Sequence, residues 1–130
     1  MSDLNAEDTT TNEGMGFTFN AVLADLAGAV LPVSRINAAT LTLFDFETQK
    51  IINDRNAQDV LNNNDVTIDE SGNLKWVIQS LDVPIVGTAV VAGDTEMHTA
   101  LFQITYDGDH QVNEDVQIYV RQLIKYPTTP

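Results

Sequence analysis

Hydrophobic and polar residues alternate along most of the chain, and this period of two is typical of strands that bury one face. Phe17, Phe19 and Ala21 share one side of the first such segment, while Thr18 and Asn20 share the other. Turn residues separate the later segments from one another. We therefore predict about seven short strands, over residues 17–23, 36–47, 50–54, 66–70, 74–80, 96–108 and 114–126.

The clearest hairpin pattern is NDVTIDESGNLKWVIQS, residues 64–80. Its centre is Ser71-Gly72-Asn73, and glycine and asparagine tolerate the positive φ of a tight turn. We expect Trp76, the single tryptophan of the chain, to lie at the centre of the core. The positions expected to face inward on this hairpin and on the last strand are Val66, Ile68, Leu74, Trp76, Ile78, Val116, Ile118 and Val120. On the strand over residues 36–47, Ala39, Leu41 and Leu43 are expected to share one face.

Helical patterning is almost absent, since only residues 56–65 indicate one or two helical turns. Many short strands with almost no helix predict an all-β fold, an antiparallel β-sandwich. Residues 1–15 are polar and acidic, and we predict a flexible N-terminal arm, either disordered or ordered on a neighbouring subunit. Residues 16–126 then form a single sandwich domain, and residues 127–130 an extended tail.

Composition narrows the possible partners. The 130 residues suit one domain, and the absence of cysteine excludes disulfides, thiolate metal sites and a cysteine nucleophile. The net charge is −13, and the six basic residues are scattered, so we expect no nucleic-acid partner. No run of about 18 apolar residues and no secretory signal is present, so we expect no membrane partner. An acidic surface can, however, dock onto a basic protein.

Two acidic clusters are candidate metal sites. Asp65, Asp69 and Glu70 surround Gly72, but their spacing does not fit a calcium-binding EF-hand loop. Asp65 and Asp69 would also lie about 13 Å apart along a strand. We therefore interpret these acids as the solvent-facing side of the hairpin. The second cluster leaves two alternatives open, a solvated turn or a loose calcium loop made by Asp107, Asp109 and Asp115.

Catalytic patterns are missing from the sequence. No serine lies in a G-x-S-x-G elbow, and no phosphate-binding glycine loop occurs. His98 lies in the middle of a predicted strand, where we interpret it as a partly buried structural or interface histidine. We therefore expect no catalytic, cofactor-binding or metal-binding residue, no cofactor, and no enzymatic activity.

Three stretches resemble a known family when they are taken together. Residues 17–48 contain D-x-x-G followed by I-x-x-A-x-L-T-L-x-D, residues 51–76 contain R-x-A-Q-x-V-L-N and V-T-x-D-x-x-G-N-L-x-W, and TALFQITYDG with VQIYVR closes the pattern. The chain thereby resembles small structural proteins of tailed-bacteriophage virions, and is similar to the N-terminal domains of baseplate upper proteins. The resemblance implies an Ig-like sandwich, a place in the virion after synthesis in the host cytoplasm, and no catalytic residues.

The first functional hypothesis is a head-decoration or cement protein that stabilises the capsid lattice. Its expected partners are the major capsid protein or other virion proteins, together with further copies of itself. Contacts are expected through strand edges, the N-terminal arm and the apolar loop PIVGTAVVAG, residues 84–93. A second hypothesis places the chain in the tail, the baseplate or the head–tail junction. A third, of another class, is a carbohydrate-binding adhesion module.

Overall fold

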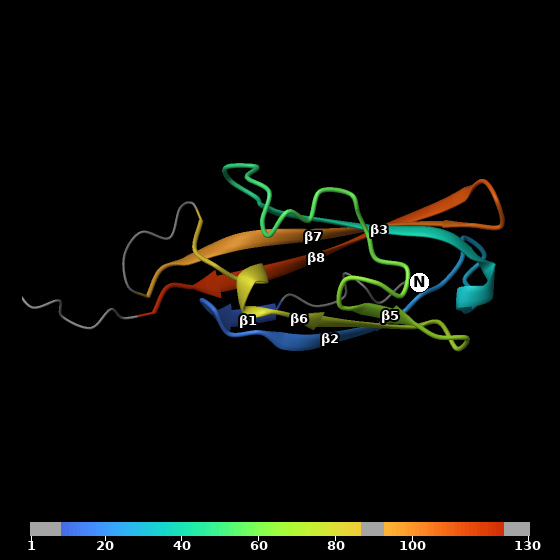
Figure 1. The fold of residues 1–130 in the computed structure, drawn as a ribbon, viewed down its shortest axis with the longest axis horizontal. Coiled ribbons are helices and arrows are strands. Elements are labelled where there is room, and N and C mark those ends of the chain that lie inside the picture. Colours follow the sequence, from blue (N-terminus) through green and yellow to red (C-terminus); the bar gives the residue numbers. More distant parts are fainter. Residues whose placement is uncertain (1–8, 87–92, 124–130) are drawn as a thin grey trace, which may run out of the picture.

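Two β-sheets packed face to face make up the computed structural model, which describes residues 9–86 and 93–123 (Figure 1). One sheet has the strand order β1-β8-β7-β3-β4 and the other has the order β2-β6-β5. The elements are β1 (Thr9–Asn12), β2 (Phe17–Val22), η1 (Val33–Arg35), β3 (Ile36–Asp45), β4 (Gln58–Asp59), β5 (Val66–Ile68), β6 (Asn73–Ile78), η2 (Ser80–Asp82), β7 (Thr95–Tyr106) and β8 (His110–Arg121).

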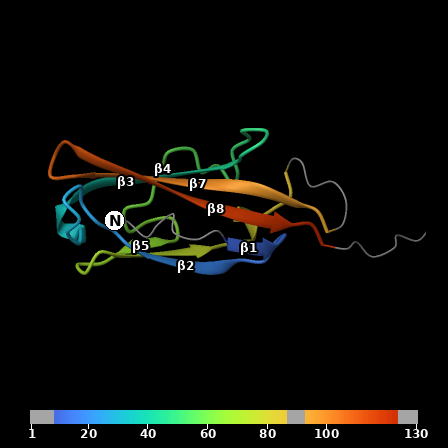
Figure 2. The same ribbon diagram turned by 180° about the vertical axis from the view of Figure 1, so that it is seen from behind.

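The arrangement of strands is that of an Ig-like β-sandwich, which confirms the predicted fold class. The strands follow the order found in the two sheets of immunoglobulin domains. In one sheet β4, β3, β7 and β8 are neighbours in that order, and the opposite sheet has the order β2-β6-β5. One detail differs from the wholly antiparallel sandwich that was predicted. β1 pairs with the outer edge of β8, and the two strands run in the same direction (Figure 2).

The predicted flexible arm is wrong for residues 9–12, because these residues form β1. Thr9 is aligned with Ile118, and the side-chain hydroxyl of Thr11 is buried and donates to the Met15 carbonyl at 2.8 Å. Pairing with the edge of β8 satisfies backbone groups that a free arm would leave to water. Residues 1–8 and the predicted tail, 127–130, lie outside the described residues.

The connection between β3 and β5 also differs from its prediction. Residues 50–54 form no strand, and Ile51 makes a single bridge to Phe44. No α-helix occurs in residues 56–65, which instead contain the two-residue strand β4. The reason is local, because several positions adopt a positive φ that neither a helix nor a regular strand accommodates. These positions are Asn53, Asp54, Ala57, Asn62, Asn64 and Asp65.

The core fills the space between the sheets, and the positions predicted to face inward on the hairpin and on the last strand are all buried. Trp76 is fully buried and meets Phe102 of the opposite sheet edge to face, with 5.7 Å between the ring centroids. In antibody domains the buried tryptophan belongs to the strand equivalent to β3. Here Trp76 comes from β6, so the same central position is filled from the other sheet.

Candidate functional site

Asp45, Glu96 and His98 form a cluster of ionisable side chains in the interior of the protein. Asp45 ends β3 and is aligned with His98 of β7, while Glu96 lies two residues before His98 on the same face. None of the three is more than 2% exposed. One donor atom from each residue lies within 4.8 Å of the other two, which makes this the group of possible metal ligands in the described residues.

The hydrogen bonds of this cluster leave some of its atoms unpaired. His98 Nε2 lies 2.5 Å from Glu96 Oε2 and 3.9 Å from Asp45 Oδ1. Asp45 Oδ2 accepts bonds from both the backbone N–H and the hydroxyl of Thr48, and Glu96 Oε2 accepts one from the Val86 N–H. In contrast, Asp45 Oδ1 and His98 Nδ1 are buried and have no hydrogen-bond partner among the described residues.

The sequence did not reveal this cluster. His98 was expected to be partly buried, but it is fully buried beside two carboxylates. The pattern Glu96-x-His98 on one strand face was visible in the sequence, whereas the pairing with Asp45 depends on the register of β3 against β7. That register joins residues 53 positions apart, and alternation alone does not fix it.

A second polar network centres on Arg55, which is 2% exposed. Its guanidinium donates to both carboxylate oxygens of Asp82 at 2.6 and 3.2 Å, and to Asp65 at 2.9 Å. The remaining donors bind the Gln58 side chain and the Asn64 carbonyl. All five N–H groups of the arginine therefore donate hydrogen bonds within the protein. The guanidinium has no donor left for a ligand, so we interpret this network as structural.

The acids of the first sequence cluster have different partners in the structure. Asp65 binds Arg55, and Glu70 accepts a bond from the Ser34 hydroxyl. Asp69 closes the β5–β6 turn, accepting from the backbone N–H groups of Ser71 and Asn73. The bond from Asn73 holds the pKa of Asp69 below its ordinary value of 3.8. Each acid has a different local partner, so they form no joint metal site.

The second acidic cluster does not converge on a calcium position either. Asp107 binds Arg35, Asp109 pairs with His110 at 3.1 Å, and Asp115 lies further along β8. Within residues 9–86 and 93–123 the only triad of close metal-type ligands is the buried one described above. The loose calcium loop is therefore not preformed by these three carboxylates among the described residues, and calcium binding there stays a prediction.

Arg35 joins the loops at one end of the sandwich. Its Nη1 lies 3.0 Å from Asp25 Oδ2, and its Nη2 lies 2.6 Å from Asp107 Oδ2. The arginine lowers the pKa of Asp107, whereas the pKa of Asp25 is lowered first by the Ala29 N–H and then by the arginine. We call residues 23–35, 69–73 and 106–110 the loop end, which lies at the right of Figure 1.

The loop end presents an apolar residue on a fixed backbone. Leu26 is 70% exposed, although its N–H donates to the buried Tyr106 hydroxyl at 3.0 Å. Asp25 Oδ1 accepts from the N–H groups of Ala27 and Ala29 at 3.0 and 2.9 Å, which closes the loop. The backbone on both sides of Leu26 is therefore tied down while its side chain points into solvent.

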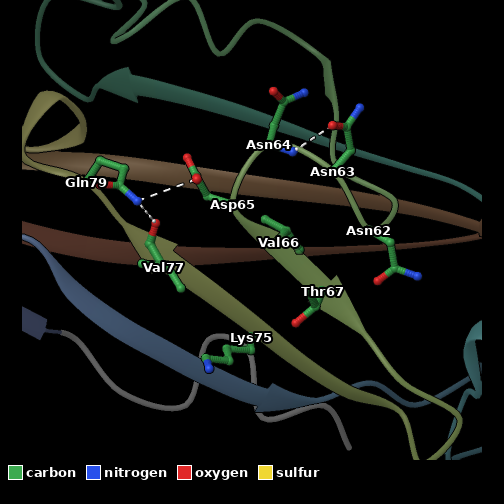
Figure 3. Close-up of a pocket in the computed structure, with 9 residues that line it drawn as sticks. All are labelled: Asn62, Asn63, Asn64, Asp65, Val66, Thr67, Lys75, Val77 and Gln79. Carbon is green, nitrogen blue, oxygen red and sulfur yellow. Dashed lines mark hydrogen bonds between the residues drawn. The ribbon is translucent and has the colours of Figure 1, made fainter.

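A surface hollow of about 510 Å³ lies beside the edge strand β5 (Figure 3). The Gln79 side chain points toward the neighbouring Asp65, and Lys75 also lines the hollow (Figure 3). All of its lining residues except Val66 are exposed, and none is aromatic. Sugars usually stack on aromatic rings, so the hollow gives no support to the carbohydrate-binding alternative. Of the predicted contact loop, residues 84–93, positions 87–92 lie outside the described residues.

Comparisons with known proteins give only weak likenesses. No protein-family model and no curated protein matches the chain. CopC from Methylosinus trichosporium OB3b is similar in structure, with 9% identity and a TM-score of 0.48 over 92% of this chain and 89% of CopC. The N-terminal Ig1-2 module of Drosophila receptor protein tyrosine phosphatase DLAR is similar at 11% identity and a TM-score of 0.41, over 94% of this chain and 48% of the module. Both scores are too low to support an inference about family, ligand or function.

Within residues 9–86 and 93–123, no helix is long and apolar enough to span a bilayer.

Proposed function

We propose that the protein is a structural component of a tailed-phage virion that docks through its loop end onto a neighbouring virion protein, in the manner of a decoration or cement protein. The observation that carries this proposal is Leu26, an apolar side chain held out into solvent by a loop whose backbone is fixed. Apolar anchors on preorganised backbones are favoured at protein interfaces, because little conformational entropy is lost on binding.

Charge supports a basic partner for the loop end. The single arginine of this surface, Arg35, is already bound by two carboxylates, so its charge is offset within the protein. The network around Arg55 likewise removes a second arginine from the surface. Acidic residues around an exposed apolar side chain favour binding of a basic partner and speed its association. The acids of the loop end are Asp25, Asp69, Glu70, Asp107 and Asp109.

Quantitative mass spectrometry of purified particles from the phage that encodes the chain tests the proposal. Copies on the order of hundreds per particle indicate the shell, whereas about six or twelve indicate the tail, baseplate or head–tail junction. Absence of the protein from purified particles would refute the virion role. Cryo-EM of the same particles then locates the protein and shows whether the loop end faces its neighbour.

Two matched substitutions test the docking surface. Leu26→Asp places a charge on the anchor, and Leu81→Asp makes the same change at a residue of nearly equal exposure, 69%, in η2. We expect Leu26→Asp to lower particle occupancy at least tenfold, and Leu81→Asp to leave it unchanged. Circular dichroism checks that both variants fold. Equal occupancy of the two variants would show that the loop end is not the docking surface.

A further inference from the structure

We propose that Asp45, Glu96 and His98 bind a divalent transition-metal ion of the Zn²⁺ class in the interior of the sandwich. The ion would link the last residue of β3 to the start of β7, and so hold together the two strands at that end of the sheet. This site is separate from the loop end, so its test does not depend on the proposed virion function.

The first argument is the unpaired carboxylate oxygen. Asp45 is 0% exposed, its Oδ1 has no hydrogen-bond partner among the described residues, and this oxygen lies 3.9 Å from His98 Nε2. A buried acceptor without a partner is costly, and a buried carboxylate oxygen is more costly still. A cation within reach of this oxygen removes the cost and also offsets the charge of Glu96.

The second argument is the kind of donor. Calcium and magnesium select oxygen ligands, whereas an imidazole nitrogen with two carboxylate oxygens suits zinc and its transition-metal neighbours. Donors on a tetrahedral zinc ion lie roughly 3.3–3.5 Å apart, given bonds of about 2.0–2.2 Å. The distances from His98 Nε2, 2.5 Å to Glu96 and 3.9 Å to Asp45, lie on either side of this value. Side-chain shifts of about 1 Å would therefore bring the three donors to the spacing of a zinc site, with the fourth position left for a water molecule.

The third argument is orientation of the ligands by their neighbours. Thr48 donates twice to Asp45 Oδ2, at 2.9 and 2.8 Å, and thereby turns Oδ1 toward His98. The Val86 N–H holds Glu96 Oε2 at 2.9 Å. Residues that hydrogen-bond to metal ligands in this way hold the ligands in position and raise the affinity of the site for the metal. Because Thr48 is exposed, its side chain can be changed without opening the core.

Metal titration of the full chain tests the proposal. The protein is stripped with EDTA and titrated with Zn²⁺, Mn²⁺, Cu²⁺ and Ca²⁺ by calorimetry. We expect about one tightly bound Zn²⁺ per chain, a Tm that rises with zinc concentration, and no comparable response to Ca²⁺. Identical Tm values with zinc and with EDTA would overturn the proposal.

NMR of the histidine rings gives a readout within the unchanged protein. The chain has two histidines, and His110 is exposed beside Asp109 at the surface. Zinc should shift the ring signals of His98 and leave those of His110 in place, and His110→Asn assigns the two sets. Shifts confined to His110 would mean that zinc binds only the acidic surface.

Substitutions separate ligands from their surroundings. His98→Asn and Asp45→Asn should abolish tight zinc binding, whereas His110→Asn should retain it. Thr48→Ala should weaken binding about 10–100-fold without unfolding the protein, and Thr18→Ala, an exposed change on β2, should have no effect. If His98→Asn fails to fold, the comparison of Thr48→Ala with Thr18→Ala decides. Equal zinc affinity in those two variants would overturn the assignment.

Discussion

Arg55 and Asp82 form an ion pair inside the sandwich, with 2.6 Å between Nε and Oδ1 and at most 2% of either side chain exposed. Asp82 also accepts from Asn53 and from the Gln79 N–H, so its carboxylate is fully used. The pair therefore holds the long β3–β5 connection against η2. Its hydrogen bonds are complete, which is the condition under which a buried charge is tolerated.

Asp82→Asn should destabilise the protein by about 3–5 kcal/mol, because it leaves the buried charge of Arg55 without its main partner. Urea unfolding followed by circular dichroism measures the change. Asp65→Asn removes the exposed partner of the same arginine and should cost about 1 kcal/mol or less. Equal losses of unfolding free energy in the two variants would show that the burial of the partner carboxylate does not determine its contribution to stability.

Trp76→Ala should cost about 3–5 kcal/mol, a large share of the stability of a domain this size. Trp76→Phe should cost roughly half as much, because a ring still meets Phe102 and the buried Nε1 has no hydrogen bond to lose. Unfolding of both variants is followed by far-UV circular dichroism, since they lack the tryptophan fluorophore. A phenylalanine variant as unstable as the alanine variant would contradict this account of the core.

Gly72 and Gly108 both have a positive φ, but their surroundings differ. A Cβ at Gly72 would lie 2.7 Å from Val30 and 3.1 Å from the Leu31 carbonyl, whereas one at Gly108 would meet nothing within 4 Å. Gly108→Ala should therefore cost about 1–2 kcal/mol from backbone strain alone. Gly72→Ala should cost about 1–3 kcal/mol more, since neighbouring backbone must also move. Urea unfolding of the two variants measures the difference.

Acid should loosen the loop end. The folded-state pKa values of Asp25, Asp69 and Asp107 lie below their ordinary value of 3.8. Their contribution to stability is therefore complete above about pH 4 and is lost as the pH falls through the lowered folded-state values. Carboxylate NMR titration should give values below 3.8 for these three residues.

A pair of variants isolates the role of Arg35 in this acid response. Asp107→Asn should reduce the difference in stability between pH 7 and pH 3, because it removes a carboxylate that the arginine keeps ionised. Glu47→Gln, a change at an exposed acid in the turn after β3, serves as the control. The same reduction in both variants would assign the acid sensitivity to overall charge.

Local patterns in the sequence predicted the hairpin and the inward faces, because alternation and turn residues act over a few positions. Gly72 shows this, since its positive φ follows from the turn it occupies. Partners distant in the sequence were not predictable in the same way. The strand β1 depends on a free edge more than 100 residues later, at Ile118, and the buried cluster depends on the register of Asp45 with His98. Arg55 likewise reaches its main partner, Asp82, only through the packing of its loop against η2.

The parallel pairing of β1 with β8 has a mechanical consequence. Thr9 lies beside Ile118 and Asn12 beside Arg121, so the two strands point the same way. A force that pulls residue 9 and residue 121 in opposite directions acts along both strands and loads all of their cross-strand hydrogen bonds together in shear. Antiparallel edge strands pulled at one shared end would instead open one bond at a time, like a zipper. The sandwich is therefore built to resist stretching along its long axis.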